Sequence, residues 1–135
     1  MQLKASNQEQ ILSNLLSQFG RDRLVISTDH IDGEIVTHGW QRNTGIKLLE
    51  TTNEFVRHGF SEFLTTNVSK DGTLGGPDMA SLDNVCKIGG TNVIASGGIS
   101  KLDDIESVKK CNPYGVILGK ALYEGLVSIE EAKRI

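Results

Sequence analysis

Two short apolar runs near the C-terminus, each ending abruptly in glycine, constrain the fold most. They occupy Val93–Ile99 and Val116–Ala121. Each run is long enough for a buried parallel strand, and helical patterns follow over Leu102–Lys109 and Ala121–Glu124. Glycine lets backbone amides approach a ligand, and a helix start presents unpaired N–H groups with partial positive charge. Two such turns on neighbouring strands predict a phosphate site; the alternative is that the glycines only shape tight turns.

The rest of the chain continues this alternation of strands and helices. Further helices are predicted over Gln8–Phe19, Ile46–His58, Asp78–Lys87 and Ile129–Ile135, and further strands over Leu24–Asp29 and Phe63–Thr66. The stretch His30–Gly45 is expected to be irregular, with a short hairpin around Glu34–Thr37 as an alternative, and Val68–Pro77 is a glycine-rich loop. Strands that alternate with helices form a parallel sheet with right-handed crossovers.

This pattern contains four βα units, whereas a (βα)8 barrel needs eight. A chain of 135 residues forms one domain. Four strands alone would keep two unpaired edges and an inner face that normally fills a barrel. We therefore predict an α/β fold: half of a (βα)8 TIM-type barrel over residues 1–135, with four parallel strands and helices on the outer face. A second copy, or a missing N-terminal half-barrel, would close it.

Composition excludes several partners. The net charge is −3, from 14 basic and 17 acidic residues, which disfavours nucleic acid. The first ten residues are polar, and no stretch approaches membrane-spanning length, so no membrane partner is expected. Cys86 and Cys111 have neither metal-ligand spacing nor disulfide density, which predicts reduced thiols in a cytoplasmic protein. The three histidines suggest no metal site.

Polar residues at the predicted strand ends are the candidates for chemistry. Asp29 ends an apolar strand, where partial burial suits proton transfer; an Asx turn or a helix cap is the alternative. Asp71 lies in the loop Lys70–Pro77, where it either acts on a ligand or only forms an Asp-Gly turn. Thr66 either binds a ligand or caps its strand. Trp40, the only tryptophan, is expected to stack on a flat ligand.

Together these segments resemble the phosphoribosyl isomerases of histidine biosynthesis. The matching motifs, in family order, are STDHIDGEIVTHGW, NTGI, TTNVSKDGTLGGPD, IASGGIS and GVILGKALYEG. They cover about Arg23–Ile135, and the first helix matches the family's fourth, so the match spans helix 4 and βα units 5–8. The sister cyclase shares strand 5 and the DGT motif, but Gly39-Trp40, Gly76-Pro77, Ile99 and Gly119–Ala121 are similar to the isomerase.

The resemblance implies a reaction without metal or cofactor, in which the ProFAR aminoaldose becomes the PRFAR aminoketose by an Amadori rearrangement. Two aspartates of the family relay protons to a phosphorylated sugar-imidazole substrate. The implied positions are Asp29 and Asp71 for acid/base catalysis, Thr66, Trp40 and Gly72 for substrate contacts, and Gly97, Gly98, Gly119 and Lys120 for phosphate. Lys120 occupies a position where the family often has arginine, so a point charge replaces a bidentate side-chain contact.

The family's strand-1 base and second phosphate site have no counterpart in these residues. The chain alone is therefore expected to be inactive or nearly so. Two alternatives remain open at this point. One is a non-catalytic half-barrel that binds phosphate and assembles with itself, and the other is half of the sister cyclase or of another phosphate-binding barrel.

Overall fold

Six strands form one sheet in the computed structural model, which describes residues 7–39 and 41–135. The strands, in the spatial order β3-β2-β1-β4-β5-β6, are β1 (Val25–Ile31), β2 (Glu34–Thr37), β3 (Arg42–Lys47), β4 (Glu62–Asn67), β5 (Asn92–Ser96) and β6 (Gly115–Val116). The helices are α1 (Asn7–Phe19), α2 (Leu48–Arg57), α3 (Met79–Cys86), α4 (Leu102–Lys109), α5 (Lys120–Tyr123) and α6 (Ile129–Ala132), with a short 3₁₀ turn at Arg21–Arg23.

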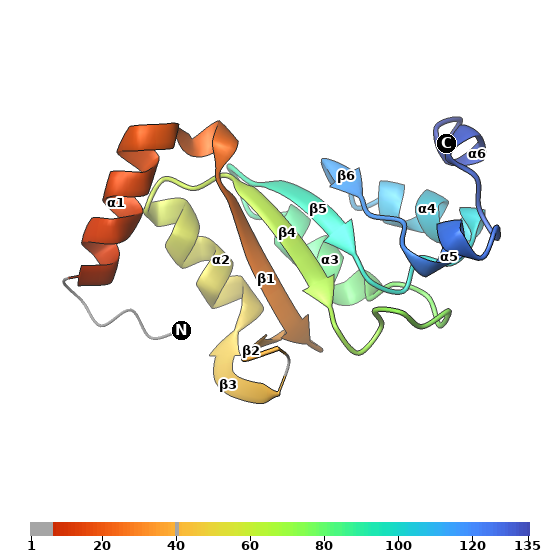
Figure 1. The fold of residues 1–135 in the computed structure, drawn as a ribbon, viewed down its shortest axis with the longest axis horizontal. Coiled ribbons are helices and arrows are strands. Elements are labelled where there is room, and N and C mark those ends of the chain that lie inside the picture. The colour runs from red at the N-terminus through yellow and green to blue at the C-terminus, as the bar shows by residue number, and fades with distance from the viewer. Residues whose placement is uncertain (1–6, 40) are drawn as a thin grey trace.

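The strands β1, β4, β5 and β6 are parallel to one another (Figure 1). Helix α2 lies between β1 and β4 in the chain, α3 between β4 and β5, and α4 between β5 and β6. This arrangement confirms the predicted α/β class and its four parallel strands. The helix predicted over Leu102–Lys109 has these bounds in the structure. Among the described residues, no helix is long and apolar enough to cross a membrane.

The stretch after Asp29, expected to be irregular with a short hairpin around Glu34–Thr37, contains antiparallel strands, of which Glu34–Thr37 is one. Strand β2 pairs with the end of β1, and β3 pairs with β2. Asp32 and Gly33 both have positive φ, 47° and 84°, which suits the tight two-residue turn between β1 and β2. The prediction that the first strand ends at Asp29 is therefore wrong, because the hairpin extends β1 to Ile31. Helix α2 likewise begins at Leu48, after β3 has ended.

The C-terminal elements are shorter than predicted. Strand β6 holds two residues, and Ile117 is 44% exposed, so the run that begins at Val116 is not a buried strand. The last helix, expected to reach Ile135, ends at Ala132. Strand β6 is an edge strand of the described sheet, so no further described strand pairs with it.

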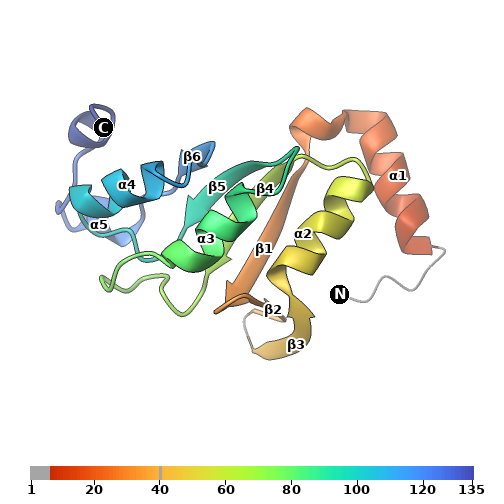
Figure 2. The same ribbon diagram turned by 180° about the vertical axis from the view of Figure 1, so that it is seen from behind.

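The two faces of the sheet differ because side chains alternate along each strand. Helices α2, α3 and α4 cover one face (Figure 2). That face carries the buried strand side chains Thr28, His30, Phe63, Thr65, Val93 and Ala95. The apolar core lies between this face and the helices, and it includes Leu48 from α2, Leu82 and Val85 from α3, and Ile105 and Val108 from α4.

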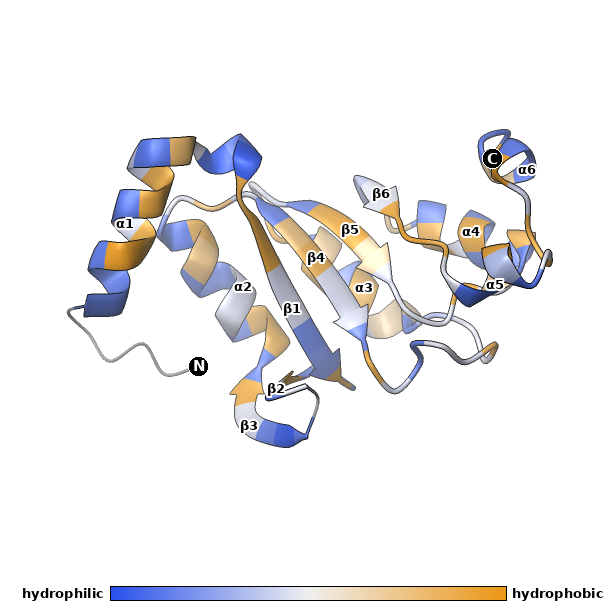
Figure 3. Ribbon diagram, viewed as in Figure 1, coloured by the Kyte–Doolittle hydropathy of each residue, from blue (hydrophilic) through white to orange (hydrophobic). Residues whose placement is uncertain are grey.

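No described helix covers the opposite face, which we call the open face (Figure 1). By strand alternation and register, it carries Val25, Ser27, Asp29, Glu62, Leu64, Thr66, Asn92, Ile94 and Ser96. Val25 is 52% exposed there, although it lies in a strand. Each of β1, β4 and β5 contains a short apolar run and becomes more polar toward its carboxyl end (Figure 3). The three helices between the parallel strands thus lie on one face of the sheet, as expected for successive βα units.

This difference between the faces predicts unequal costs for the same substitution. Val93→Ala, on the helix-covered face, should lower the free energy of unfolding by about 2 kcal/mol, because a fully buried side chain is lost. Val25→Ala, on the open face, should cost less than about 0.5 kcal/mol. Urea unfolding at low protein concentration would measure both. Equal costs would show that the open face is packed as tightly as the core.

Candidate functional site

The candidate site begins with a row of polar side chains at the carboxyl edge of the parallel strands. Asp29 of β1 is paired in register with Thr66 of β4, and Thr66 with Ser96 of β5. The three residues lie on the open face. Ser27 donates a hydrogen bond from Oγ to Oδ1 of Asp29 at 3.1 Å, and Thr66 is buried. The sheet therefore places one carboxylate and two hydroxyl groups side by side.

A small cavity of about 40 Å³ adjoins this row and gathers most of the predicted site residues. Its lining comes from three segments: Asp71, Gly72 and Thr73; Ser96, Gly97, Gly98 and Ile99; and Ile117, Gly119 and Lys120. Six of the nine predicted residues thus meet around one cavity. Asp29 and Thr66 do not line it, and Ser96 connects their row to it. The predicted contact from Trp40 lies outside the described residues.

The loop 68–77 packs tightly on the turn at Gly97 and Gly98. Both glycines have positive φ, 100° and 78°. A Cβ atom on Gly98 would lie 2.3 Å from the carbonyl oxygen of Gly76, and one on Gly97 would lie 2.7 Å from that of Asn67. Any other residue would collide with backbone atoms of Asn67 at position 97 and of Gly76 at position 98. Glycine therefore permits this close packing, which brings Asp71 to the cavity.

The helix starts contribute less to an anion site than the sequence suggests. Asp104 caps α4, because its Oδ2 accepts hydrogen bonds from the amides of Ser100 at 2.9 Å and Lys101 at 3.1 Å. Helix α5 has only four residues, so its dipole is small. Lys120, its first residue, is exposed and lies 3.6 Å from Glu124. Positive charge at the cavity therefore comes mainly from the Lys120 side chain.

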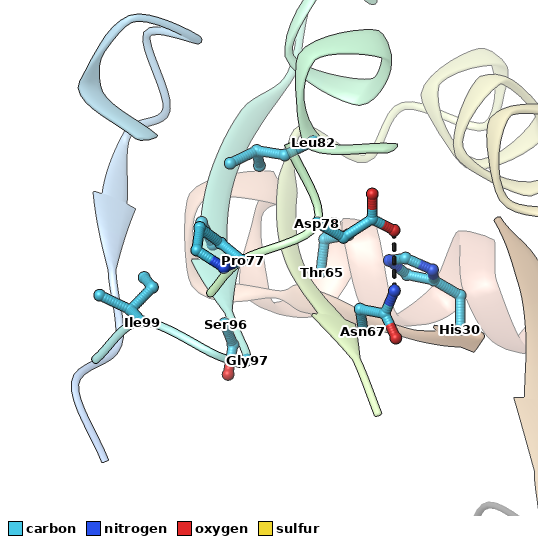
Figure 4. Close-up of a pocket in the computed structure, with 10 residues that line it drawn as sticks. His30, Thr65, Asn67, Pro77, Asp78, Leu82, Ser96, Gly97 and Ile99 are labelled. Carbon is cyan, nitrogen blue, oxygen red and sulfur yellow. Dashed lines mark hydrogen bonds between the residues drawn. The ribbon is translucent and has the colours of Figure 1, made fainter. Parts of the chain in front are cut away.

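A second group of polar residues lies on the other side of the sheet, and sequence reasoning missed most of it (Figure 4). Nδ2 of Asn67 donates to Oδ2 of Asp78 at 2.7 Å, and His30 lies beside both residues around a second small cavity. Oδ1 of Asp78 accepts from the amide of Ser81 and caps α3, close to the first-turn position predicted for it. No local pattern signals the contact between Asn67 and Asp78, because it joins residues eleven positions apart across a loop.

Burial and hydrogen bonding set the charges of this group. Burial lowers the pKa of His30, although the carboxylates of Asp78, Asp32 and Asp29 oppose this shift. The amide of Gly33 donates to Nδ1 of His30 at 3.1 Å, which requires an unprotonated nitrogen there. Burial alone would raise the pKa of Asp78, but hydrogen bonds from Ser81 and Asn67, together with the nearby His30, lower it below its usual value.

The two cysteines and the acidic groups offer no further chemistry. Cys86 and Cys111 are both free, and burial raises the pKa of the Cys86 thiol to about 11. This thiol therefore stays protonated and unreactive at neutral pH. Within residues 7–39 and 41–135, no group of three or more histidine, cysteine or acidic side chains could hold a metal ion.

The fold and the site define a class. A parallel sheet with helices on one face, and with polar side chains and glycine turns at the carboxyl edge of its strands, is the architecture of (βα)-barrel proteins, which bind their ligands at this edge. A profile for the family described as "Histidine biosynthesis protein" matches residues 3–128. The chain therefore belongs to the histidine biosynthesis protein family.

Individual relatives carry the name 1-(5-phosphoribosyl)-5-((5-phosphoribosylamino)methylideneamino)imidazole-4-carboxamide isomerase. The relative from Nitrosopumilus maritimus is 54% identical over 131 residues, which are 97% of this chain and 56% of the relative. The relative from Cenarchaeum symbiosum is 47% identical over 121 residues, which are 90% of this chain and 52% of the relative. The relative from Thermoanaerobacter sp. is 39% identical over 120 residues, which are 89% of this chain and 50% of the relative. The chain thus spans about half the length of these curated relatives.

The buried His30 predicts that stability falls in mild acid. The unfolded chain takes up a proton near pH 6.5, whereas the folded imidazole resists it, so the unfolded state binds more protons below that pH. The free energy of unfolding should fall by up to about 1.4 kcal/mol per pH unit just below pH 6.5. Urea unfolding between about pH 7 and pH 5 would show this slope.

His30→Gln should flatten the slope, because the variant has no imidazole at this position. His38→Gln is the matched control, since it removes an exposed histidine from the hairpin loop, and it should keep the slope. A His30→Gln variant as acid-sensitive as the parent chain would assign the effect to other groups.

Proposed function

We propose that the chain is the C-terminal half-barrel, helix 4 and βα units 5–8, of a phosphoribosyl isomerase that converts the ProFAR aminoaldose to the PRFAR aminoketose in histidine biosynthesis. One observation carries the proposal most: Asp71 and Gly72 share a cavity with Gly97, Gly98 and Lys120, at the carboxyl edge of the sheet. The names of the isomerase relatives support the reaction.

Each predicted residue has a role in the proposed reaction. The amides of Gly97, Gly98 and Gly119, together with the Lys120 ammonium, bind one phosphate group of the substrate; a flexible lysine supplies charge without fixing orientation. Thr66, Gly72 and Trp40 contact the rest of the substrate. These contacts hold the sugar so that its reacting carbons lie over the open face near Asp29.

Proton transfer in this proposal begins at Asp29. Its carboxyl group protonates the ring oxygen, and the sugar opens to a protonated imine. Removal of the C2 proton then gives an enol, which becomes the ketose. Asp71 contacts the substrate and assists acid/base transfer from the loop. Such groups typically contribute about 10²–10⁴-fold in rate. The reaction is proposed to need no metal and no cofactor, because proton transfers alone interconvert the two sugars.

The base that removes the C2 proton is not among the residues of this chain. Two observations support a complementary half-barrel that supplies this base. One face of the sheet has no covering helix, and the chain spans only about half the length of its relatives. The partner is either the N-terminal half or a second copy, with neither nucleic acid nor a membrane involved. Alone, the chain is proposed to be inactive or nearly so, and to reside in the cytoplasm, where both free thiols stay reduced.

Self-association without catalysis is the second candidate function. The exposed Val25 on the open face and the edge strand β6 favour it, since both would be covered in a complex of two copies. Turnover separates the two functions, because a self-associating phosphate-binding half-barrel would not isomerise ProFAR after any half-barrel is added. The relatives' isomerase names favour the isomerase over the sister cyclase.

The catalytic role is tested in a restored barrel. The chain is combined with the part of the Nitrosopumilus maritimus relative that it does not match, and ProFAR turnover is measured. Asp29→Asn should lower kcat by about 10²–10⁴-fold while phosphate affinity is kept, because the acid is lost and the phosphate contacts remain. Asp22→Asn removes an exposed carboxylate that precedes the amino end of β1, opposite the carboxyl edge, and should leave kcat unchanged. Near-normal turnover by the Asp29 variant would refute the assignment.

The open face predicts association of the isolated chain. Covering a few hundred Å² of its apolar surface would contribute several kcal/mol, at roughly 25 cal/mol per Å². A two-fold dimer is the commonest solution for such a surface. Sedimentation equilibrium at low micromolar concentration should therefore show a dimer. A stable monomer that binds no hydrophobic dye would mean that the chain covers its open face in another way.

A further inference from the structure

Asn67 is the last residue of β4, and its side chain lies where three segments meet. It is 3% exposed. Its Nδ2 donates to Oδ2 of Asp78 at 2.7 Å and, at a longer 3.4 Å, to Oδ1 of Asp32. Its Oδ1 accepts from the amide of Ser69 at 3.0 Å and from the Ser69 hydroxyl at 2.7 Å. All four hydrogen-bonding positions of the carboxamide are therefore used.

These contacts close the base of the loop that carries Asp71. Asn67 precedes the loop 68–77 and Asp78 follows it, so their hydrogen bond joins the two ends of the loop (Figure 4). The carbonyl oxygen of Asn67 also accepts from the amides of Lys70 at 3.1 Å and Asp71 at 3.0 Å. One residue thus orders both the entry of the loop and its exit.

The same residue connects the loop to the turn at Gly97. The space for a Cβ at Gly97 is filled by the carbonyl oxygen of Asn67, and the space at Gly98 by that of Gly76. The loop whose two ends Asn67 joins therefore packs directly against the backbone of this turn. Asp71 then faces the cavity that Gly98 and Lys120 also line.

We propose that Asn67 is a positioning residue, whose carboxamide locks the loop 68–77 against the Gly97–Gly98 turn and so holds Asp71 at the candidate phosphate site. The consequence for catalysis rests on the proposed function, whereas the order of the loop does not. Asn67 touches no reacting atom in this account and acts through the loop backbone and Asp78.

The chemistry of the contact requires an amide. Asp32 and Asp78 both present carboxylate oxygens to Nδ2 of Asn67. A carboxylate of the same shape would lose both donated hydrogen bonds and repel both neighbours. The shape of Asn67→Asp is nearly unchanged, so the variant changes charge and donor capacity without creating a cavity.

Exchanging the two residues restores the shorter contact, between positions 67 and 78, with its polarity reversed. Only the longer contact to Asp32 stays without a donor. In Asn67→Asp/Asp78→Asn, the amide at position 78 donates to the carboxylate at position 67. The oxygen at position 67 still accepts from Ser69, and the oxygen at position 78 still accepts from Ser81. Net charge equals that of the parent chain. Asn84→Asp, at an exposed position of α3, is the control for added charge alone.

The test measures amide hydrogen exchange at Ser69, Lys70 and Asp71 in the 135-residue chain, and then titrates inorganic phosphate while the amides of the glycine turns are followed by NMR. Asn67→Asp should speed exchange at these amides by about tenfold or more and weaken phosphate binding. The reason is that the variant loses the hydrogen bonds that Nδ2 donates and places a carboxylate next to Asp78. The exchanged double variant should return both to within about threefold of the parent. Asn84→Asp should change neither.

Two results would overturn the proposal: unchanged loop exchange in Asn67→Asp, or a double variant that is as stable as the parent but keeps a loosened loop. If Asn67→Asp does not fold, the double variant decides alone. The two proposals fail separately. Absence of phosphate shifts in the parent chain contradicts the proposed function, whereas loop exchange tests the locking without any ligand.

Discussion

The in-register parallel pairing of β1, β4 and β5 is the constraint on which the rest of the structure depends. It aligns Asp29, Thr66 and Ser96 in one row at the carboxyl edge. Because side chains alternate, a slip of one residue in β1 would turn Asp29 toward the helices and bring Thr28 to the open face. On the helix side, the same register brings the hydroxyls of Thr28 and Thr65 within 3.0 Å, so both faces favour this register.

The helix-covered face supplies rigidity, and the carboxyl edge supplies the site. A core of side chains from β5, α3 and α4 fixes the strands, while the loop 68–77 and the glycine turns project from their ends. The open face belongs to neither part. Its side chains include the exposed Val25 beside the polar Ser27 and Asp29.

Much of this site could be predicted from residue type and position. Asp29 and Thr66 follow apolar runs, and the glycines end them, so the carboxyl edge was visible in the sequence. The two glycine turns alone predicted a phosphate site, and the family resemblance then assigned Gly119 and Lys120 to it. The extension of β1 to Ile31 was missed because it depends on pairing with β2. The capping of α4 by Asp104 was missed as well, and it occupies the amides of Ser100 and Lys101 just before the helix.

The sequence by itself determined the order of strands and helices, the α/β class and the position of the glycine turns, because local periodicity and backbone freedom carry that information. Only the tertiary structure decided that six predicted residues share one cavity, that one face of the sheet stays open, and that Asn67 joins Asp78 behind the loop. These features arise from contacts between segments distant in the chain, which depend on strand register and loop packing, and no local pattern encodes either one.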